Sequence, residues 1–213
     1  MSLFVDFKDG ASKQELDMAK ETIESGGIIA FPIDNMYVLG VSVFNADGIM
    51  KLYDIKNRPH NKPISVLVSD YSMIKSVAKD IDEDEKKLID TFLPGPLTIV
   101  LDKKEEIPDF ISEGNNTVGV RMPSSELALK LIRGVKVPLA VTSANLYGEE
   151  DPRNIESVKD DFGNLVDCYI DAGELEESSH STVVRVEEGN LNIIREGAIS
   201  KEEIDKVIME GKE

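Results

Sequence analysis

Lys56-Asn57-Arg58-Pro59 follows an apolar, helix-like segment, and Thr142-Ser143-Ala144-Asn145 follows a buried strand much later in the chain. Two cations close together, held in an extended loop by a proline, suit a chain of phosphate groups. Ser143 and Asn145 supply neutral hydrogen bonds of the kind that orient a sugar, a base or a carboxylate. Together the two stretches predict a site that handles a nucleotide.

The bulk composition is that of a globular protein with an excess of acid. The chain has 213 residues, of which 41% are hydrophobic and 31% charged, and its net charge is -17. This length fits one large domain or two small ones. Strong anionic charge disfavours broad, nonspecific nucleic-acid binding, whereas a local cationic groove would still attract a small anion such as ATP. Such acidity is also typical of proteins from salty cytoplasms.

Targeting signals and disulfide pairs are not predicted. No apolar run approaches the length of a membrane span, and residues 1–10 contain acids rather than a cleavable apolar core. Cys168 is the only cysteine, so no disulfide can form within the chain. We therefore expect a cytoplasmic protein with no membrane partner.

Helical and strand patterns alternate along the chain, which predicts an α/β protein with a mixed sheet and a single domain over residues 1–213. Helices are predicted over residues 12–25, 47–55, 72–79, 82–92, about 125–134, and from 200 onward. Strands are predicted over residues 28–32, 38–44, 64–68, 97–101, 117–121, 139–142, 168–172, 181–186 and 192–195. Residues 146–165 are the most linker-like stretch.

Seven short motifs occur in one order along most of the chain. They are Phe31-Pro32 with Tyr37 and Leu39-Gly40, Lys56-x-Arg58-Pro59 with Pro63-Ile64, Leu93-Pro94-Gly95-Pro96-Leu97-Thr98, Val118-Gly119-Val120-Arg121-x-Pro123, Thr142-Ser143-Ala144-Asn145 with Gly148, Ser181-Thr182-Val183-Val184, and Arg195-x-Gly197-Ala198-Ile199. In these the chain resembles the YrdC-like threonylcarbamoyl-AMP synthase family. The resemblance implies a twisted open mixed sheet with flanking helices and a deep cationic groove. The short form, without the extra C-terminal domain of some members, is expected.

The resemblance implies a nucleotidyltransferase that joins L-threonine, bicarbonate and ATP. The expected product is L-threonylcarbamoyl-AMP, released with pyrophosphate and passed to a tRNA threonylcarbamoyl transferase that modifies adenosine 37. Mg²⁺ bound mainly by ATP is implied, and no dedicated protein metal site is expected. Direct contact with tRNA or double-stranded RNA is a further expectation.

The family's site residues carry over to ten positions. Lys56 and Arg58 match the catalytic cations of the triphosphate site. The nucleotide set further comprises Thr117, Ser143, Asn145 and Arg195. The set for the amino acid comprises Lys62, Arg121, Ser181 and Tyr37, with the Arg121 guanidinium on the threonine carboxylate. For Tyr37, packing against the base and capping of the core are both open interpretations.

The loop after Pro32 departs from the family pattern of Thr, acid, Thr, any residue, Tyr, Gly. Here it reads Ile33-Asp34-Asn35-Met36-Tyr37-Val38, so two hydroxyl groups are replaced and a valine takes the place of a glycine. Because this loop contributes to the threonine end of the groove, two alternatives stay open. One is a diverged, non-catalytic paralogue that binds nucleotide or double-stranded RNA. The other is an adenylating enzyme with a different amino acid.

Structural roles are also open for several of these residues. Lys56 and Arg58 could favour the dipole of the preceding helix. Arg121 and Arg195 could form surface ion pairs in so acidic a chain. His60 and His180 are expected to be exposed loop residues, because neither has the neighbours of a zinc site.

Overall fold

Strand β2 (Ile29–Pro32) comes from a continuous apolar run because both of its faces are buried. The computed structural model describes residues 2–8, 10, 12–177 and 179–209. Side chains alternate between the two faces of a strand. Ile28 and Ala30 therefore join one hydrophobic cluster, and Ile29 and Phe31 join the other. The described residues thus have a hydrophobic core on each face of the sheet.

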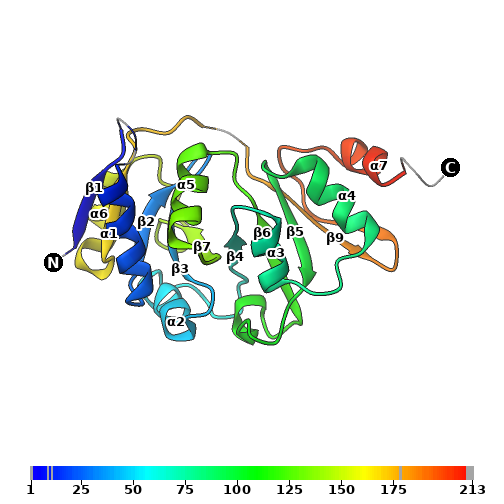
Figure 1. Cartoon of the computed structure of the whole chain (residues 1–213), viewed down its shortest axis with the longest axis horizontal. Coiled ribbons are helices and arrows are strands. Elements are labelled where there is room, and N and C mark those ends of the chain that lie inside the picture. The colour runs from blue at the N-terminus through cyan, green and yellow to red at the C-terminus, as the bar shows by residue number, and fades with distance from the viewer. Residues whose placement is uncertain (1, 9, 11, 178, 210–213) are drawn as a thin grey trace.

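A single sheet of ten strands runs through the described residues (Figure 1). In spatial order the strands are β1 (Leu3–Asp6), β8 (Cys168–Asp171), β2, β3 (Tyr37–Ser42), β7 (Leu139–Ser143), β4 (Ser65–Leu67), β6 (Thr117–Arg121), β5 (Leu97–Asp102), β9 (Thr182–Glu187) and β10 (Asn190–Arg195). The sheet contains both parallel pairs, such as β4 with β6, and antiparallel pairs, such as β3 with β7. The predicted mixed α/β sheet is confirmed.

The helices cover the two faces of the sheet unequally. Their bounds are α1 (Lys13–Glu24), α2 (Ala46–Ile55), α3 (Tyr71–Val77), α4 (Glu83–Phe92), α5 (Glu126–Val135), α6 (Ile155–Phe162) and α7 (Lys201–Met209). Helices α1 and α5 pack on one face, in a cluster that reaches only as far as β4. Within the described residues, β5, β6 and β9 add nothing to that cluster. This face of the sheet therefore loses its helical cover between β4 and β9.

Helix ends show where local signals predicted the fold and where they failed. The predicted capping box of α1 is present, since the Glu15 amide donates to Ser12 Oγ and the Ser12 amide donates to Glu15 Oε2. The prediction that Asp47 caps α2 was wrong. Asn45 caps this helix, and its Oδ1 accepts from the Gly48 amide at 3.0 Å. The linker-like stretch 146–165 contains α6, which is capped by Asn154.

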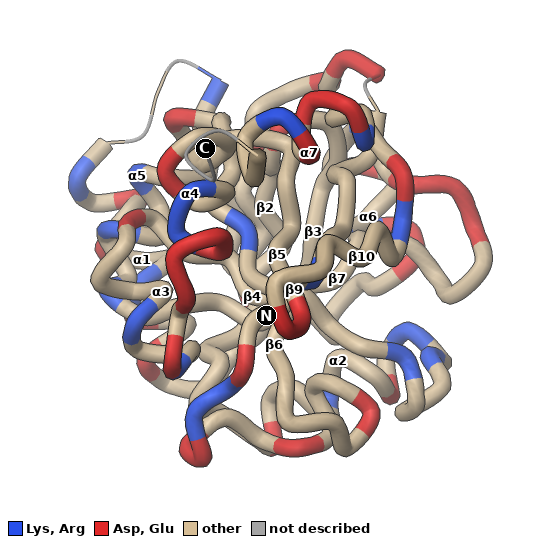
Figure 2. The backbone as a smooth tube through the Cα atoms, turned by 90° about the vertical axis from the view of Figure 1, so that its right-hand side faces the viewer, with Lys and Arg blue, Asp and Glu red and all other residues tan. Residues whose placement is uncertain are grey.

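Acidic residues are spread over the outside of the molecule, for example along α4 and α7 (Figure 2). Among the described residues the buried acids are Glu85 and Asp171, and the buried cations are Lys56, Lys103 and Arg121. Lys103 forms an ion pair with Asp109, and Asp171 forms one with Lys8. The other two buried cations, Lys56 and Arg121, are both predicted site residues. In the described part of the chain, no helix has the length and apolar character needed to cross a membrane.

Helix α5 offers a test of the core on the face that is partly open. Leu131 is fully buried in the α1 and α5 cluster, whereas Leu165 is 49% exposed. Leu131→Ala should lower the free energy of unfolding by about 2–5 kcal/mol, because a cavity remains where the side chain was. Leu165→Ala is the matched control and should change it by less than about 1 kcal/mol. Urea unfolding measures both, and equal effects would contradict this packing.

Candidate functional site

A pocket with a volume of about 280 Å³ lies on the sheet face that α1 and α5 leave open. Strand residues Val38, Leu67, Thr98, Arg121 and Val141 contribute to its lining. Two loops that come from elsewhere in the chain add Asp151 and His180. Five of the ten predicted site residues line this pocket: Arg58, Arg121, Ser143, Ser181 and Arg195.

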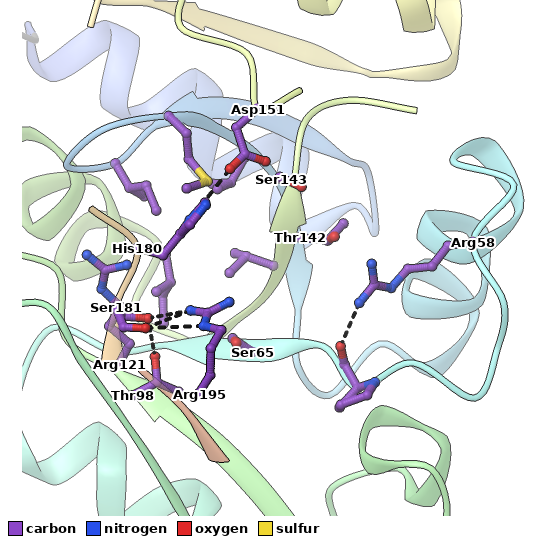
Figure 3. A pocket seen from close by; sticks show the side chains of 16 residues that line it. Arg58, Ser65, Thr98, Arg121, Thr142, Ser143, Asp151, His180, Ser181 and Arg195 are labelled. Carbon is purple, nitrogen blue, oxygen red and sulfur yellow. Dashed lines mark hydrogen bonds and ion pairs between the residues drawn. The ribbon is translucent and has the colours of Figure 1, made fainter. Parts of the chain in front are cut away.

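Three guanidinium groups divide the pocket into two ends. Figure 3 shows Arg58 on one side and Arg121 and Arg195 together on the other, beside Ser181. Ser143 and Thr142 lie between these two groups of cations. The arrangement fits a ligand that carries anionic groups at two separate points.

Arg121 ends strand β6 and is only 7% exposed. Its Nη2 lies 2.5 Å from Asp34 Oδ2, and Asp34 Oδ1 accepts from Ser124 Oγ at 2.7 Å and from the Ser125 amide at 2.6 Å. Burial lowers the pKa of the Arg121 guanidinium, and the Asp34 charge opposes that shift. Asp34, in the loop that departs from the family pattern, therefore fixes Arg121 in place.

Two of the pocket arginines carry a buried donor that has no acceptor. Arg58 Nη2 donates to the Pro63 carbonyl at 2.9 Å, and its guanidinium lies 5.8 Å from the ring centroid of Tyr147. The Nε atoms of both Arg58 and Arg121 are buried and make no hydrogen bond within the described part of the chain. Unpaired buried donors are uncommon and unfavourable. Both side chains line the pocket, but these two Nε atoms are closed off from solvent.

Arg195 and Ser181 form a hydrogen-bonded group at the other end of the pocket. Arg195 Nε and Nη2 donate to the Ser181 carbonyl at 3.3 and 2.8 Å, and Nη2 also reaches Ser181 Oγ at 3.1 Å. Ser181 Oγ and Thr98 Oγ1 share a hydrogen bond of 2.9 Å. Burial lowers the pKa of the Arg195 guanidinium, with Asp151 opposing. The hydroxyl groups at this end are thus held in place by their neighbours.

Lys56 lies behind the pocket wall rather than in the lining. Its Nζ donates to the Ser143 carbonyl, to the Asn145 carbonyl at 2.7 Å and to Asn145 Oδ1 at 3.0 Å. Burial, together with the nearby Arg58 cation, lowers the pKa of the Lys56 ammonium to about 7. Asn145 Oδ1 also accepts from Ser143 Oγ at 2.7 Å. Lys56 and Asn145 therefore hold Ser143 in position, and direct nucleotide contact by either residue stays a prediction.

Three further predicted residues lie away from the pocket lining. Thr117 starts strand β6, four residues before Arg121 and hence roughly 13 Å from it along the strand. Lys62 is exposed, and its carbonyl accepts from Tyr53 at 2.7 Å. Tyr37 is fully buried, and its hydroxyl donates to the Gly173 carbonyl at 2.7 Å and accepts from the Ala172 amide at 3.0 Å. Of the two interpretations of Tyr37, core capping is the one that agrees with this position.

Several lining residues were not among the ten predicted site residues. His180 was expected to be an exposed loop residue. Its side chain is exposed, yet it lines the pocket with Nδ1 3.6 Å from Asp151 Oδ2 (Figure 3). Ile33, Met36 and Val38 also line the pocket. Ile33 and Val38 depart from the family pattern, which was the available signal, whereas Met36 stands where the family takes any residue. Nothing in the local sequence pointed to the contact between Asp151 and His180.

The donor set fits a magnesium ion that is held largely by its substrate. Among the described residues, no group of three or more His, Cys, Asp or Glu side chains could hold a metal ion. Asp151 is the carboxylate in the pocket lining. Mg²⁺ commonly uses one or two carboxylates together with substrate phosphates. Asp151 is therefore the side chain suited to contact such an ion.

Comparison with known proteins assigns the family. A family model described as "Telomere recombination" (Sua5_yciO_yrdC) matches residues 21–197. The chain belongs to the Sua5/YciO/YrdC family. It is 34% identical over 210 residues to the threonylcarbamoyl-AMP synthase of Pyrococcus abyssi, covering 99% of this chain and 62% of that protein. For the Bacillus subtilis enzyme of the same name, the identity is 33% and the shares are 96% and 60%. The chain thus spans about three fifths of the length of these two relatives.

Solved structures of the Sua5/YciO/YrdC family share this fold. P. abyssi Sua5 complexed with L-threonine is 34% identical with a TM-score of 0.91, and the match covers 97% of this chain and 61% of that one. Escherichia coli YciO is 26% identical with a TM-score of 0.84, and the match covers 96% and 100% of the two chains.

Gly197 packs so closely on the segment that carries His180 and Ser181 that a side chain there would collide with backbone. An added Cβ would lie 2.4 Å from the His180 carbonyl oxygen and 2.6 Å from the Thr182 nitrogen. Gly197→Ala should therefore lower the free energy of unfolding by about 1–3 kcal/mol. Gly134→Ala on α5, where a Cβ meets nothing within 4 Å, is the control and should be neutral or stabilising. Urea unfolding decides, and equal results for the two variants would contradict the close approach.

The buried ammonium of Lys56 predicts a pH dependence of stability. Its pKa is about 7 in the folded chain and 10.5 ordinarily, so between these values the unfolded chain binds a proton that the folded chain has lost. The free energy of unfolding should therefore rise with pH through this window, and Lys56→Met should remove that part of the slope. Urea unfolding from about pH 7 to about pH 10 measures the difference. Parallel pH profiles for the two proteins would show that burial does not depress this pKa.

Proposed function

We propose that the chain catalyses ATP-dependent formation of L-threonylcarbamoyl-AMP from L-threonine and bicarbonate, with release of pyrophosphate. The observation that carries this proposal is one pocket with arginines at two separate ends. A polyphosphate at one end and a carboxylate at the other would match these cations. Relatives named threonylcarbamoyl-AMP synthase and a relative's complex with L-threonine support the choice of substrates.

The reaction has two balanced steps. The uncharged amino group of threonine attacks bicarbonate carbon, an N–C bond forms, and water leaves to give a carbamate. A carbamate oxygen then attacks the α-phosphorus of ATP as the bond from that phosphorus to the bridging oxygen of pyrophosphate breaks. Neither step needs a side-chain nucleophile. The chain would act by positioning its substrates and by stabilising the developing charge.

The roles of the pocket residues follow from their places. Arg58 would place its guanidinium charge beside the phosphates of the leaving group. Arg121, held by Asp34, would bind the threonine carboxylate, and Ser143 would contact the nucleotide between the two ends. Lys56 and Asn145 would act through Ser143, whose backbone and hydroxyl they hold. Mg²⁺ on the phosphates, with Asp151 as the side chain suited to reach it, would offset charge on the leaving pyrophosphate.

The wider setting is part of the same proposal. A nucleotidyltransferase of this kind belongs in the cytoplasm, upstream of a transferase that moves the threonylcarbamoyl group to adenosine 37 of tRNA. Its adenylate is a reactive anhydride, so the consuming reaction is a group transfer. The non-catalytic alternative differs from this enzyme in one respect that can be measured, which is turnover.

Product analysis separates the enzyme from a binding module. The chain is incubated with ATP, Mg²⁺, bicarbonate and L-threonine, and the products are analysed by mass spectrometry together with a pyrophosphate assay. The proposal expects L-threonylcarbamoyl-AMP and pyrophosphate in equal amounts, and neither product without bicarbonate. ATP binding by calorimetry without any product would instead support the non-catalytic module.

Arg58→Ala should lower kcat/KM for pyrophosphate release by about 100-fold or more, since it removes a fixed charge at the leaving group. Arg133→Ala is a matched control, because Arg133 is exposed on α5 and lies outside the pocket lining. Both variants should keep the urea unfolding curve close to that of the parent chain. Unchanged pyrophosphate release by a folded Arg58→Ala protein would remove Arg58 from the mechanism.

A further inference from the structure

The pocket has an apolar wall beside Arg121. We define it by five side chains: Ile33, Met36, Val38, Leu67 and Val141. All five line the pocket and belong to the hydrophobic cluster of α1 and α5. Ile33 is 6% exposed and Val38 is 2% exposed, so these side chains are packed like core residues and only their remaining surface meets the pocket. The wall is therefore a closely packed, preformed surface.

The strand register places this wall next to Arg121. Leu67 pairs directly with Arg121 between β4 and β6, and Val141 pairs with Ser65 on the next strand. Asp34, whose carboxylate holds Arg121, comes from the same loop as Ile33 and Met36. A ligand whose carboxylate lies on Arg121 would therefore place its adjacent carbon atoms against the apolar wall.

Several hydrogen-bonding groups near the wall are already in use, and the hydroxyl residues Ser65 and Thr142 also line the pocket. The Asp34 oxygens accept from Arg121, Ser124 and Ser125. At the far side of Arg121, Ser181 Oγ bonds to Thr98 and Arg195, and Ser143 Oγ donates to Asn145. The loop itself offers the pocket Ile33, Met36 and Val38. A hydroxyl on the ligand's side chain thus gains little at this wall, whereas a methyl group gains apolar contact.

We infer that the amino-acid end of the pocket accepts a β-branched aliphatic amino acid, with L-valine as its test compound, as readily as L-threonine. This inference rests on the proposed function. Valine has the shape of threonine with a methyl group in place of the hydroxyl. It carries the same amino and carboxylate groups, so water again leaves as the carbamate forms, and pyrophosphate again leaves as the carbamate joins the α-phosphorus.

The degree of discrimination between valine and threonine distinguishes two kinds of site. A site built to hydrogen-bond a substrate hydroxyl rejects the analogue that lacks it by about 10⁴-fold to 10⁵-fold. A hydrophobic site discriminates between such isosteres by no more than about 100-fold, in favour of the apolar one. The apolar wall therefore predicts a ratio of kcat/KM for valine over threonine of about 1 or greater.

The test is a competition between L-valine and L-threonine at equal, subsaturating concentrations, with ATP, Mg²⁺ and bicarbonate. Mass spectrometry of the two carbamoyl-adenylates gives the ratio directly in the unmodified chain. A ratio of about 1 or more supports the inference, and a ratio well below about 1 overturns it. Product from threonine alone would leave the proposed function intact. Absence of pyrophosphate with either amino acid would overturn the proposed function, and this inference with it.

Two variants test whether the wall sets this ratio. Ile33→Thr places a hydroxyl on the wall and should lower the valine-to-threonine ratio by about fivefold or more. Ile194→Thr makes the same change at a position on β10 that is 55% exposed and outside the pocket lining, and should leave the ratio unchanged. The ratio is measured within one mixture, so it does not depend on the fraction of folded protein. An unchanged ratio in Ile33→Thr would overturn the assignment of selectivity to this wall.

Discussion

The Lys56 ammonium joins two parts of the chain that lie 87 residues apart in sequence. Lys56 follows helix α2, and its three hydrogen bonds end on the backbone and side chain of the turn after β7. A buried cation is unfavourable unless it is well satisfied, so this turn can adopt few other conformations while Lys56 remains in place. The positions of Ser143 and of Arg58, two residues after Lys56, both depend on this contact.

From this contact the pocket extends across the sheet to Arg121 and Arg195. Lys56, Arg121 and Arg195 are each held by a different kind of acceptor. Lys56 donates to carbonyl oxygens, Arg121 pairs with the Asp34 carboxylate, and Arg195 donates to the Ser181 backbone. The strongly acidic surface contributes little to this arrangement, because the interactions are short and partly buried and hence weakly screened. The same geometry explains how an anionic protein can offer a local site for anions.

Sequence alone predicted the class of the fold, most of its elements and the common location of five site residues. Lys56-x-Arg58 and Ser143-x-Asn145 were expected to share a site, and the Lys56 side chain donates directly to the Asn145 side chain. Thr117 could not be placed by such reasoning, because a motif on a strand does not say which end of the strand faces the ligand. His180 and Asp151 lie on two loops that come together only in the folded chain. Local sequence spacing therefore could not predict their contact. Helix α6 was missed because a short amphipathic helix in a polar stretch gives a weak signal.

The connection from β8 to β9 crosses most of the sheet, since these consecutive strands occupy the second and ninth places in the spatial order. Ser181 lies at the end of that crossing, and Arg195 follows one strand later. A nascent chain emerging from the ribosome would therefore form the first eight strands with an incomplete substrate end. The pocket would be complete only once the hairpin of β9 and β10 pairs with β5 and brings Arg195 to it.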